Sequence, residues 1–381
     1  MIKDSFLSKG KDIYTIISNI IADKKDISNL AHMSPFFDCP VELANLGAKY
    51  ITEGYNKYSQ VNGLPKLCEA ISKKVERQYS NFYNPKTEVT ITAGATQAIY
   101  TIISSVIGDG DEVIIFEPTY NNYVSAIENN GGKAVFVQLK LPDFHIDWNE
   151  VKKMINTRTK LIVVNSPHNP TGAIFSADDL EQLKRITNGT QILVLSDEVF
   201  EHIIFNNQKH QSLARCKDLA QRTIIVSSFA MTFNVPGWKI GYCLAPEKIT
   251  RQIRETHSYQ INSVNSPLQY ALAEYLETCK IDYSAISDFY QKKKDFVNKN
   301  LKNSKLKVLD SNSTFFQLIS YKNICDEKDT DIVMKLINEK SLALFPLSVF
   351  YHDLVDNKIL GLNFAHSEEK LLEAIEKLNS L

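Results

Sequence analysis

Six short and almost purely apolar segments place the strongest constraint on how this chain can fold. Helical patterns separate several of them, and they cover residues 88–94, 112–118, 133–139, 160–167, 191–198 and 222–229. Apolar runs without alternation are typical of strands that are buried on both faces of a sheet. Strands that alternate with helices predict an α/β fold with a mostly parallel, doubly wound sheet.

Polar residues follow these predicted strands, where a parallel sheet usually binds its ligand. In open α/β sheets, ligands lie beyond the carboxyl ends of the strands. We therefore expect one functional edge, formed by Gly94-Ala95-Thr96, Glu117-Pro118, Asn169, Asp197 and Ser228.

The length of the chain and a change in its sequence pattern after about residue 275 indicate more than one domain. The chain has 381 residues, of which 44% are hydrophobic, and single cores stop growing at roughly 250–300 residues. After about residue 275, Lys-rich helical sequence gives way to short strand-like pieces and a final helix. We predict an N-terminal arm with part of a small domain (1–45), a large domain (46–275) and a small α+β domain (276–381).

Composition argues against several classes of function. A formal net charge of −1 offers no basic excess for nucleic acid. The six cysteines are scattered without a CxxC pair, and no HxH or HExxH spacing supports a metal site. The N-terminus lacks a signal-peptide apolar core, and no apolar run reaches the roughly 18 residues of a membrane span. We therefore predict a soluble cytoplasmic protein that binds a small molecule, neither nucleic acid nor membrane.

Five local motifs occur in order along the chain. Together they resemble class I/II aminotransferases, and the tail FPLSVFYHDLVDNKILGLNFA (345–365) resembles the methionine/kynurenine branch. The resemblance implies PLP-transferase fold type I with a mostly parallel seven-stranded sheet, pyridoxal phosphate (PLP) or pyridoxamine phosphate (PMP) as cofactor, and a homodimer with shared active sites. The motifs are NKYSQVNGLPKLCEAI (56–71), TAGATQAI (92–99), NSPHNPTGAIF (165–175), SDEVFEHI (196–203) and SSFAMTFNVPGWKIGY (227–242).

The resemblance assigns one group of residues to the cofactor phosphate. Backbone N–H groups at a strand-to-helix turn favour an anion, although the turn could also be an ordinary glycine turn. Lys239 would supply the cation, and Tyr58 would reach in from the partner subunit. The implied phosphate-binding residues are Gly94, Ala95, Thr96, Ser228, Lys239 and Tyr58.

A second group would bind the cofactor ring. Asp197 would pair with the ring nitrogen and keep it protonated, which makes the ring an electron sink. Asn169 would donate to the 3′ oxygen, and Tyr120 would stack on the ring. Each has a structural alternative: a helix N-cap for Asp197, a simple turn for Asn169 and core packing for Tyr120.

Four positions depart from the family pattern. Met231 occupies the place of the Schiff-base lysine, and a thioether can neither form an imine nor accept a proton at neutral pH. Phe200 stands where the family usually has Tyr, and Gly361 where an Arg would bind the substrate α-carboxylate. In NLAHMSP (29–35), Met33 replaces a glycine beside that carboxylate.

Several explanations stay open for these departures. An ordinary methionine or aromatic aminotransferase with one deliberately exchanged lysine accounts for Met231 alone. Decay to an inert relative should also have affected the phosphate-binding residues. The four departures, together with the unchanged phosphate-binding residues, therefore favour a divergent protein that binds PLP, PMP or a PLP adduct non-covalently. Ordinary amino-acid transamination by such a protein is in doubt. A non-catalytic ligand-sensing pseudoenzyme is the further alternative. His32 is the candidate for a replacement acid or base, against the simpler possibility of an exposed loop histidine.

Overall fold

The computed structural model describes residues 13–24, 26–302 and 304–380, and its centre is a seven-stranded sheet. The strand order is β2-β8-β7-β6-β5-β3-β4, and all neighbouring strands are parallel except β8, which runs antiparallel to β2 and β7. This confirms the predicted mostly parallel α/β sheet. The strands are β2 (Val89–Thr92), β3 (Glu112–Glu117), β4 (Lys133–Gln138), β5 (Thr159–Asn165), β6 (Leu193–Asp197), β7 (Thr223–Ser228) and β8 (Gly241–Leu244).

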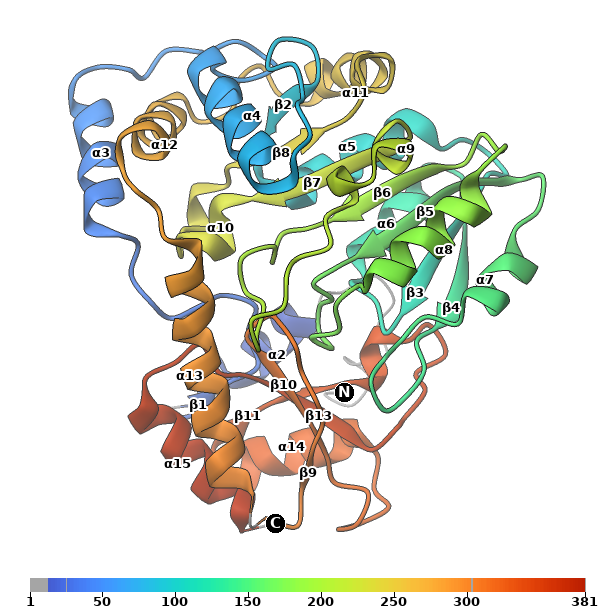
Figure 1. The fold of residues 1–381 in the computed structure, drawn as a ribbon. Coiled ribbons are helices and arrows are strands. Elements are labelled where there is room, and N and C mark those ends of the chain that lie inside the picture. The colour runs from blue at the N-terminus through green and yellow to red at the C-terminus, as the bar shows by residue number, and fades with distance from the viewer. Residues whose placement is uncertain (1–12, 25, 303, 381) are drawn as a thin grey trace.

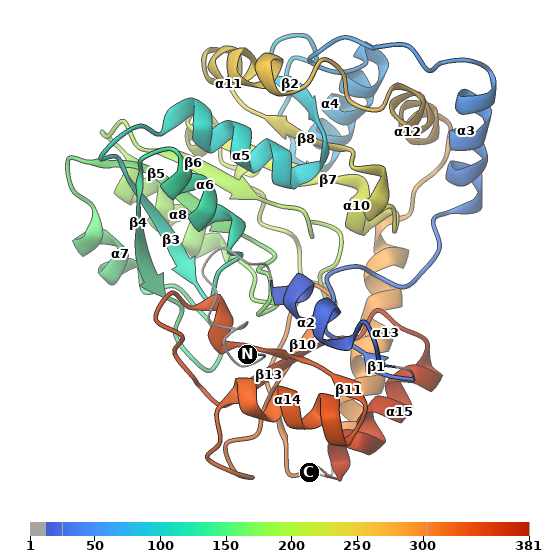
Figure 2. The same ribbon diagram turned by 180° about the vertical axis from the view of Figure 1, so that it is seen from behind.

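Helices cover both faces of this sheet, which explains the unbroken apolar runs. Along β5, Leu161 and Val163 join one buried cluster while Ile162 and Val164 join another. Figure 2 shows α5 (Gly94–Val106), α6 (Asn122–Asn129) and α11 (Glu247–Gln260) on one face. Figure 1 shows α4 (Pro65–Tyr79), α8 (Ala177–Thr187) and α9 (Lys217–Ala220) on the other.

Six of the strands follow the apolar segments that the sequence indicated, with ends trimmed by a few residues. The seventh strand, β8, was not located from the sequence. It is four residues long and lies only a few residues after the Met231 segment, so it offers no long apolar run. Its first residue, Gly241, pairs with Thr92 and Ser228, which places it beside two predicted phosphate-binding segments.

A smaller layer is built from both ends of the chain (Figure 1). Its four-stranded antiparallel sheet has the order β12-β13-β10-β9, and β1 from the N-terminal arm pairs with β11 from the C-terminal region. The division into 1–45, 46–275 and 276–381 remains a prediction. The strands are β1 (Ser28–Asn29), β9 (Lys307–Val308), β10 (Phe316–Ser320), β11 (Leu342–Ala343), β12 (Phe345–Pro346) and β13 (Ile359–Asn363).

The remaining helices connect and flank these layers. Helix α13 runs from the large sheet down along the smaller layer (Figure 1), and α3 packs on α12. These helices are α2 (Ile13–Ile21), α3 (Val41–Thr52), α7 (Trp148–Met154), α10 (Phe229–Thr232), α12 (Ser266–Thr278), α13 (Tyr283–Leu301), α14 (Asp329–Glu339) and α15 (Glu368–Asn379), with 3₁₀ turns at Leu213–Arg215, Pro236–Trp238 and Ser348–Phe350.

Two kinds of feature are absent from the described ranges. No helix within them combines the length and apolar character that a membrane span requires. Across the same residues, no group of three or more His, Cys, Asp and Glu side chains is arranged to hold a metal ion.

Candidate functional site

A cavity of about 190 Å³ opens beyond the carboxyl ends of β2, β5, β6 and β7. It gathers most of the residues that the sequence singled out, from segments more than a hundred positions apart. These are Met33, Gly94, Ala95, Thr96, Tyr120, Asn169, Asp197, Phe200, Ser228, Met231 and Lys239.

One end of the cavity suits an anion. Helix α5 begins at Gly94, and its N-cap residue Ala93 has no side chain able to cap the first N–H groups. A Cβ on Gly241 would stand 2.7 Å from the carbonyl carbon of Gly94 and 2.8 Å from the nitrogen of Ala95. Glycine is therefore required at position 241 for β8 to approach the start of the helix. The exposed N–H groups and the helix dipole favour a phosphate there.

Two side chains complete this end. Lys239 has a left-handed backbone (φ 54°), and its Nζ lies 3.6 Å from where a Cβ on Gly94 would stand. Ser228 caps the short helix α10, because its Oγ accepts the N–H of Ala230 at 3.1 Å. A cation and a hydroxyl thus lie beside the N-terminus of α5, as the phosphate role requires.

The middle of the cavity contains a buried carboxylate. The hydroxyl of Tyr123 donates to Oδ2 of Asp197 at 2.6 Å, and the N–H of Val199 donates to Oδ1 at 3.2 Å. Burial raises the pKa of Asp197 to about 6, although these hydrogen bonds act in the opposite direction. No helix begins directly after β6, where residues 199–202 form turns, so the N-cap alternative for Asp197 is wrong.

An amide with spare hydrogen-bonding capacity faces the same space. The backbone N–H of Asn169 donates to Oδ1 of Asn165 at 2.8 Å, which fixes the loop. The side-chain Oδ1 of Asn169 is buried and has no hydrogen-bond partner within the described chain. Buried polar atoms in native proteins are nearly always hydrogen-bonded, so this oxygen indicates a ligand group that donates a hydrogen bond. Tyr120 lines the cavity nearby, and its hydroxyl accepts a hydrogen bond from Asn122.

Another part of the cavity lining is apolar. Phe200 is buried, and its ring lies edge-on to Phe315 with centroids 5.2 Å apart. Met231, on α10, and Met33 are half-buried and pack against the same large hydrophobic cluster. Lys239 is the single basic side chain among the described residues that line this cavity.

Three predicted site residues do not line the cavity. His32 lies with its Nε2 3.0 Å from Nε2 of His366, and burial, then the charge of His366, lowers the pKa of His32 to about 3. Its side chain is engaged outside the cavity lining, which argues against a role as acid or base there. Tyr58 is 82% exposed in the single chain, and Gly361 lies within β13.

The expectation for Glu117 is also wrong. Its carboxylate accepts the backbone N–H of His352 at 2.6 Å and faces Nδ1 of the same residue at 3.0 Å. This carboxylate therefore ties the end of β3 to the C-terminal region instead of facing the cavity.

Sequence reasoning missed two polar residues of the site. Tyr123 lies on the first turn of α6, three positions after Tyr120, which precedes the helix. Asn165 ends β5, and its Nδ2 donates to the carbonyl oxygens of Pro167 and Asp197 at 3.1 and 2.9 Å. Closeness to Tyr120 in the sequence and strand-end position were the available signals.

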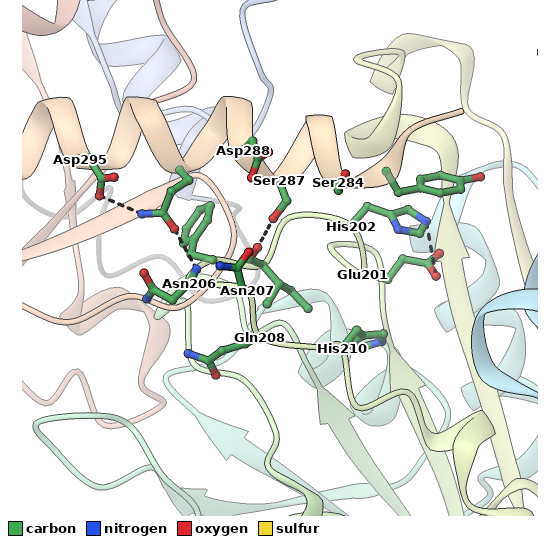
Figure 3. A pocket seen from close by; sticks show the side chains of 14 residues that line it. Glu201, His202, Asn206, Asn207, Gln208, His210, Ser284, Ser287, Asp288 and Asp295 are labelled. Atoms are coloured by element: carbon green, nitrogen blue, oxygen red, sulfur yellow. Dashed lines mark hydrogen bonds and ion pairs between the residues drawn. The ribbon is translucent and has the colours of Figure 1, made fainter. Parts of the chain in front are cut away.

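A larger cavity of about 570 Å³ lies elsewhere, between residues 201–210 and the first half of α13 (Figure 3). None of the predicted site residues lines it. Glu201, Asp288 and Asp295 give it an acidic lining, which disfavours a phosphate. The smaller cavity at the sheet edge is therefore the better candidate despite its size.

Replacing Asp197 by asparagine should stabilise the ligand-free protein. The pKa of Asp197 is about 6 in the fold and about 3.9 in an unfolded chain, so the folded state binds more protons between these values. Stability then falls as pH rises through this window, and the full cost, up to about 3 kcal/mol, is present above it. We expect a higher Tm for Asp197→Asn at pH 7.5 and little difference at pH 4. The exposed Asp288→Asn is the control; a lower Tm for Asp197→Asn at pH 7.5 would contradict the assignment.

The residues present fit a phosphorylated pyridine cofactor. The start of α5 with Lys239 suits a phosphate, and Asp197 suits a protonated ring nitrogen. Asn169 lines the same cavity, where its Nδ2 would donate to a ring oxygen and its unpaired Oδ1 would accept from a donor group of the ligand. The cavity volume lies below the roughly 300–1,000 Å³ usual for ligand pockets, which favours a small ligand.

Comparison with known proteins gives a consistent result. Residues 27–378 match the model of the family described as aminotransferase class I and II. The chain is 38% identical over 372 residues to methionine aminotransferase of Escherichia coli K12, covering 98% of this chain and 96% of that protein. It is 30% identical over 365 residues to a probable N-succinyldiaminopimelate aminotransferase of Mycobacterium tuberculosis, covering 93% and 92% of the two chains.

Solved structures show the same relationship. The crystal structure of YbdL from E. coli, for which a methionine aminotransferase function was identified, superposes with a TM-score of 0.94 at 38% identity, covering 98% of this chain and 99% of that one. N-succinyldiaminopimelate aminotransferase from M. tuberculosis superposes with a TM-score of 0.94 at 29% identity, covering 99% and 98%. The predicted fold type is thereby confirmed.

Proposed function

The chain belongs to the class I and II aminotransferase family, and from this premise we propose that it binds PLP or PMP at the sheet edge without a covalent bond to the chain. The observation that carries the proposal is the position of Met231 in the same cavity as Lys239, Asp197 and Asn169. A thioether cannot form an imine, whereas the phosphate and ring contacts do not need one.

Different residues of the chain would bind different parts of the cofactor. When bound, the cofactor supplies an electron sink. The N-terminus of α5 and Lys239 would hold its phosphate, Asp197 would hold a proton on the ring nitrogen, and Asn169 would orient the ring oxygen. Phe200 offers no hydroxyl to that oxygen, so Asn169 would be its principal donor on this side.

Ordinary amino-group transfer is the second candidate. The 38% identity with E. coli methionine aminotransferase over 98% of the chain supports it more directly than it supports a lysine-free reaction. Under this candidate, the protein transaminates methionine-like or aromatic amino acids, and position 231 is lysine in the active form. Met231 is the observation against it.

The absorbance spectrum of the protein with PLP separates these candidates. We expect retention of PLP or PMP after dialysis, with no borohydride-reducible bond to the chain and no turnover of methionine or kynurenine with an α-keto acid. A reducible bond, or ordinary turnover, would establish the second candidate. Loss of both cofactors on dialysis would refute a cofactor role. Retention without turnover of any amine or amino acid would favour a ligand-sensing role.

We also propose that the protein acts as a homodimer, as members of this family typically do. The 82% exposure of Tyr58 in the single chain supports a contact with a second copy. Analytical ultracentrifugation tests this proposal, and a monomer at micromolar concentration would contradict it.

Replacing Lys239 by methionine should weaken PLP far more than unphosphorylated pyridoxal. A charge-assisted hydrogen bond contributes about 1.5–3 kcal/mol, so we expect a loss of about 10–100-fold for PLP. Pyridoxal lacks the phosphate and should bind the variant as it binds the unchanged protein. Titration calorimetry measures both, with the exposed Lys248→Met as control. Equal losses for the two ligands would place Lys239 away from the phosphate.

A further inference from the structure

Gly361 lies in the middle of strand β13, where a residue without a side chain requires an explanation. Glycine weakens a strand interior unless another group must approach the backbone closely. Here a Cβ on Gly361 would stand 2.0 Å from both Cε2 and Cζ of Phe345. Contacts below 3.0 Å are essentially never found, so the Phe345 ring already fills the space that any side chain at position 361 would need.

Phe345 is held firmly in that place. It pairs directly with Gly361 across β12 and β13, and its side chain is fully buried. Its ring lies edge-on to Tyr14, Phe316 and Phe350, with centroids 6.0, 5.7 and 5.7 Å apart. Contacts on several sides mean that the ring cannot move aside without disrupting the small sheet.

This aromatic packing continues to the cavity. The ring of Phe316 lies 6.2 Å from that of Phe200, and Phe200 lines the cavity wall. Asn363, two residues after Gly361, donates through Nδ2 to the carbonyl oxygens of His32 and Ser34 at 2.8 and 3.0 Å. These bonds fix the loop that brings Met33 to the cavity.

The charged residues that line the cavity also disfavour a substrate carboxylate beside its apolar residues. Lys239 is the single basic residue lining the described cavity, and it lies at the phosphate end. A carboxylate placed near Phe200, Met33 and Met231 would lose its hydration without gaining a partner, which is strongly unfavourable.

We infer a steric exchange at this place: the ring of Phe345 occupies the space that a carboxylate-binding arginine at position 361 would need. The pocket therefore selects amines and carbonyl compounds that lack an α-carboxylate. This rests on the proposed function. Phe345 is then a positioning residue, because it does not line the cavity itself but acts through the packing behind Phe200 and leaves no room for an arginine at position 361.

The steric part of the inference is tested without any ligand. Gly361→Ala adds one methyl group and no charge, yet it should lower the Tm by about 1–4 °C, because overpacking forces a fully buried ring to move. Phe345→Ala should also lower the Tm, through the cavity it leaves. The double variant Gly361→Ala/Phe345→Ala should lose less than the sum of the two. Gly108→Ala, where a Cβ meets nothing closer than 3.9 Å, is the control. Unchanged stability of Gly361→Ala, or additive losses, would overturn the exchange.

The ligand part uses two probes that differ only in the carboxylate. These are the borohydride-reduced conjugates of PLP with methionine and with 3-(methylthio)propylamine. We expect calorimetry to show at least about 10-fold tighter binding of the carboxylate-free conjugate. The double variant Gly361→Arg/Phe345→Ala should reverse this preference, because it opens the space and supplies the charge.

Each other result has a defined meaning. Equal or tighter binding of the methionine conjugate by the unchanged protein overturns the inference. PMP serves as the reference ligand, and if it binds in that case the proposed function stands. If neither PMP nor either conjugate binds, the proposed function and the ligand preference fail together.

Discussion

Addition of PLP to the Met231→Lys variant is expected to give a yellow protein that retains the cofactor through dialysis and denaturation after borohydride reduction. Met231 is half-buried on α10 and lines the cavity, and lysine is also unbranched, so the new side chain fits with little repacking. Its amine would lie in partly apolar surroundings, which lower the pKa of a lysine and leave more of it as the nucleophilic free base.

The measurement is mass spectrometry of the reduced protein, which reports one phosphopyridoxyl group per chain at residue 231. Met154→Lys, at a half-exposed position on α7, is the matched control and should gain no specific adduct. An adduct at another lysine in the unchanged protein, or none in Met231→Lys, would show that the cofactor is not placed beside residue 231.

The same variant separates the loss of the lysine from the loss of the carboxylate site. If the Phe345 ring excludes an arginine at position 361, Met231→Lys alone should bind PLP covalently yet turn over methionine poorly. Efficient methionine turnover by Met231→Lys would instead support ordinary amino-group transfer, as the resemblance to E. coli methionine aminotransferase suggests.

The strands that carry the site were predictable because each is buried on both faces and so contains mostly apolar residues before its polar end. This reasoning did not locate β8, because its four residues overlap the end of the fifth motif and were not recognised as a strand. Its antiparallel direction depends on pairing with β2 and β7, which no local pattern encodes. The close approach of Gly241 to Gly94 is a consequence of this pairing, so it was not predictable either.

Within the site, residues in ordered motifs at strand ends were placed correctly. Asp197, Asn169 and Ser228 reach the cavity because the carboxyl ends of parallel strands meet at one edge. The position of Glu117 at the end of a strand was not enough to predict where its side chain lies, because its carboxylate binds a segment more than 200 residues later. The contact of His32 with His366 was not predictable either, since the two residues lie at opposite ends of the chain.

The exchange between Gly361 and Phe345 shows where sequence reasoning reaches its limit. The absence of an arginine was visible in the motif, but the group that fills its place was not. Phe345 lies 16 positions earlier and faces Gly361 only because β12 and β13 pair in this register. A one-residue slip would turn the ring to the other face of the sheet and leave the space open.

Replacing Lys74 by methionine is expected to destabilise the protein more than any substitution of a surface charge. Lys74, on α4, places its Nζ 2.6 Å from Oε1 of Glu201, and both side chains are about 95% buried, at 5% and 4% exposure. Glu201 also lines the larger cavity beside His202 (Figure 3) and accepts the hydroxyl of Ser227 at 2.7 Å. Removing one partner leaves a buried charge uncompensated, which costs about 3–5 kcal/mol.

The pH dependence of this effect follows from the carboxylate. Burial raises the pKa of Glu201, but Lys74, the adjacent His202 and hydrogen bonds outweigh it, so the pKa lies below its usual value. A depressed carboxyl pKa stabilises the fold above the unfolded value of about 4.3, and this contribution is lost as pH falls. The unchanged protein should therefore lose stability on acidification from pH 6 to pH 3 through this pair, whereas Lys74→Met should lose less.

Urea unfolding at pH 6 and pH 3 measures both effects. The matched control is Lys335→Met, which breaks the half-exposed pair with Glu327 and should change stability by less than about 1 kcal/mol. The double variant Lys74→Met/Glu201→Gln should recover part of the loss, because it removes the isolated charge along with its partner. A Lys74→Met protein as stable as the Lys335→Met control would mean that water reaches Glu201 through the larger cavity and replaces the ammonium group.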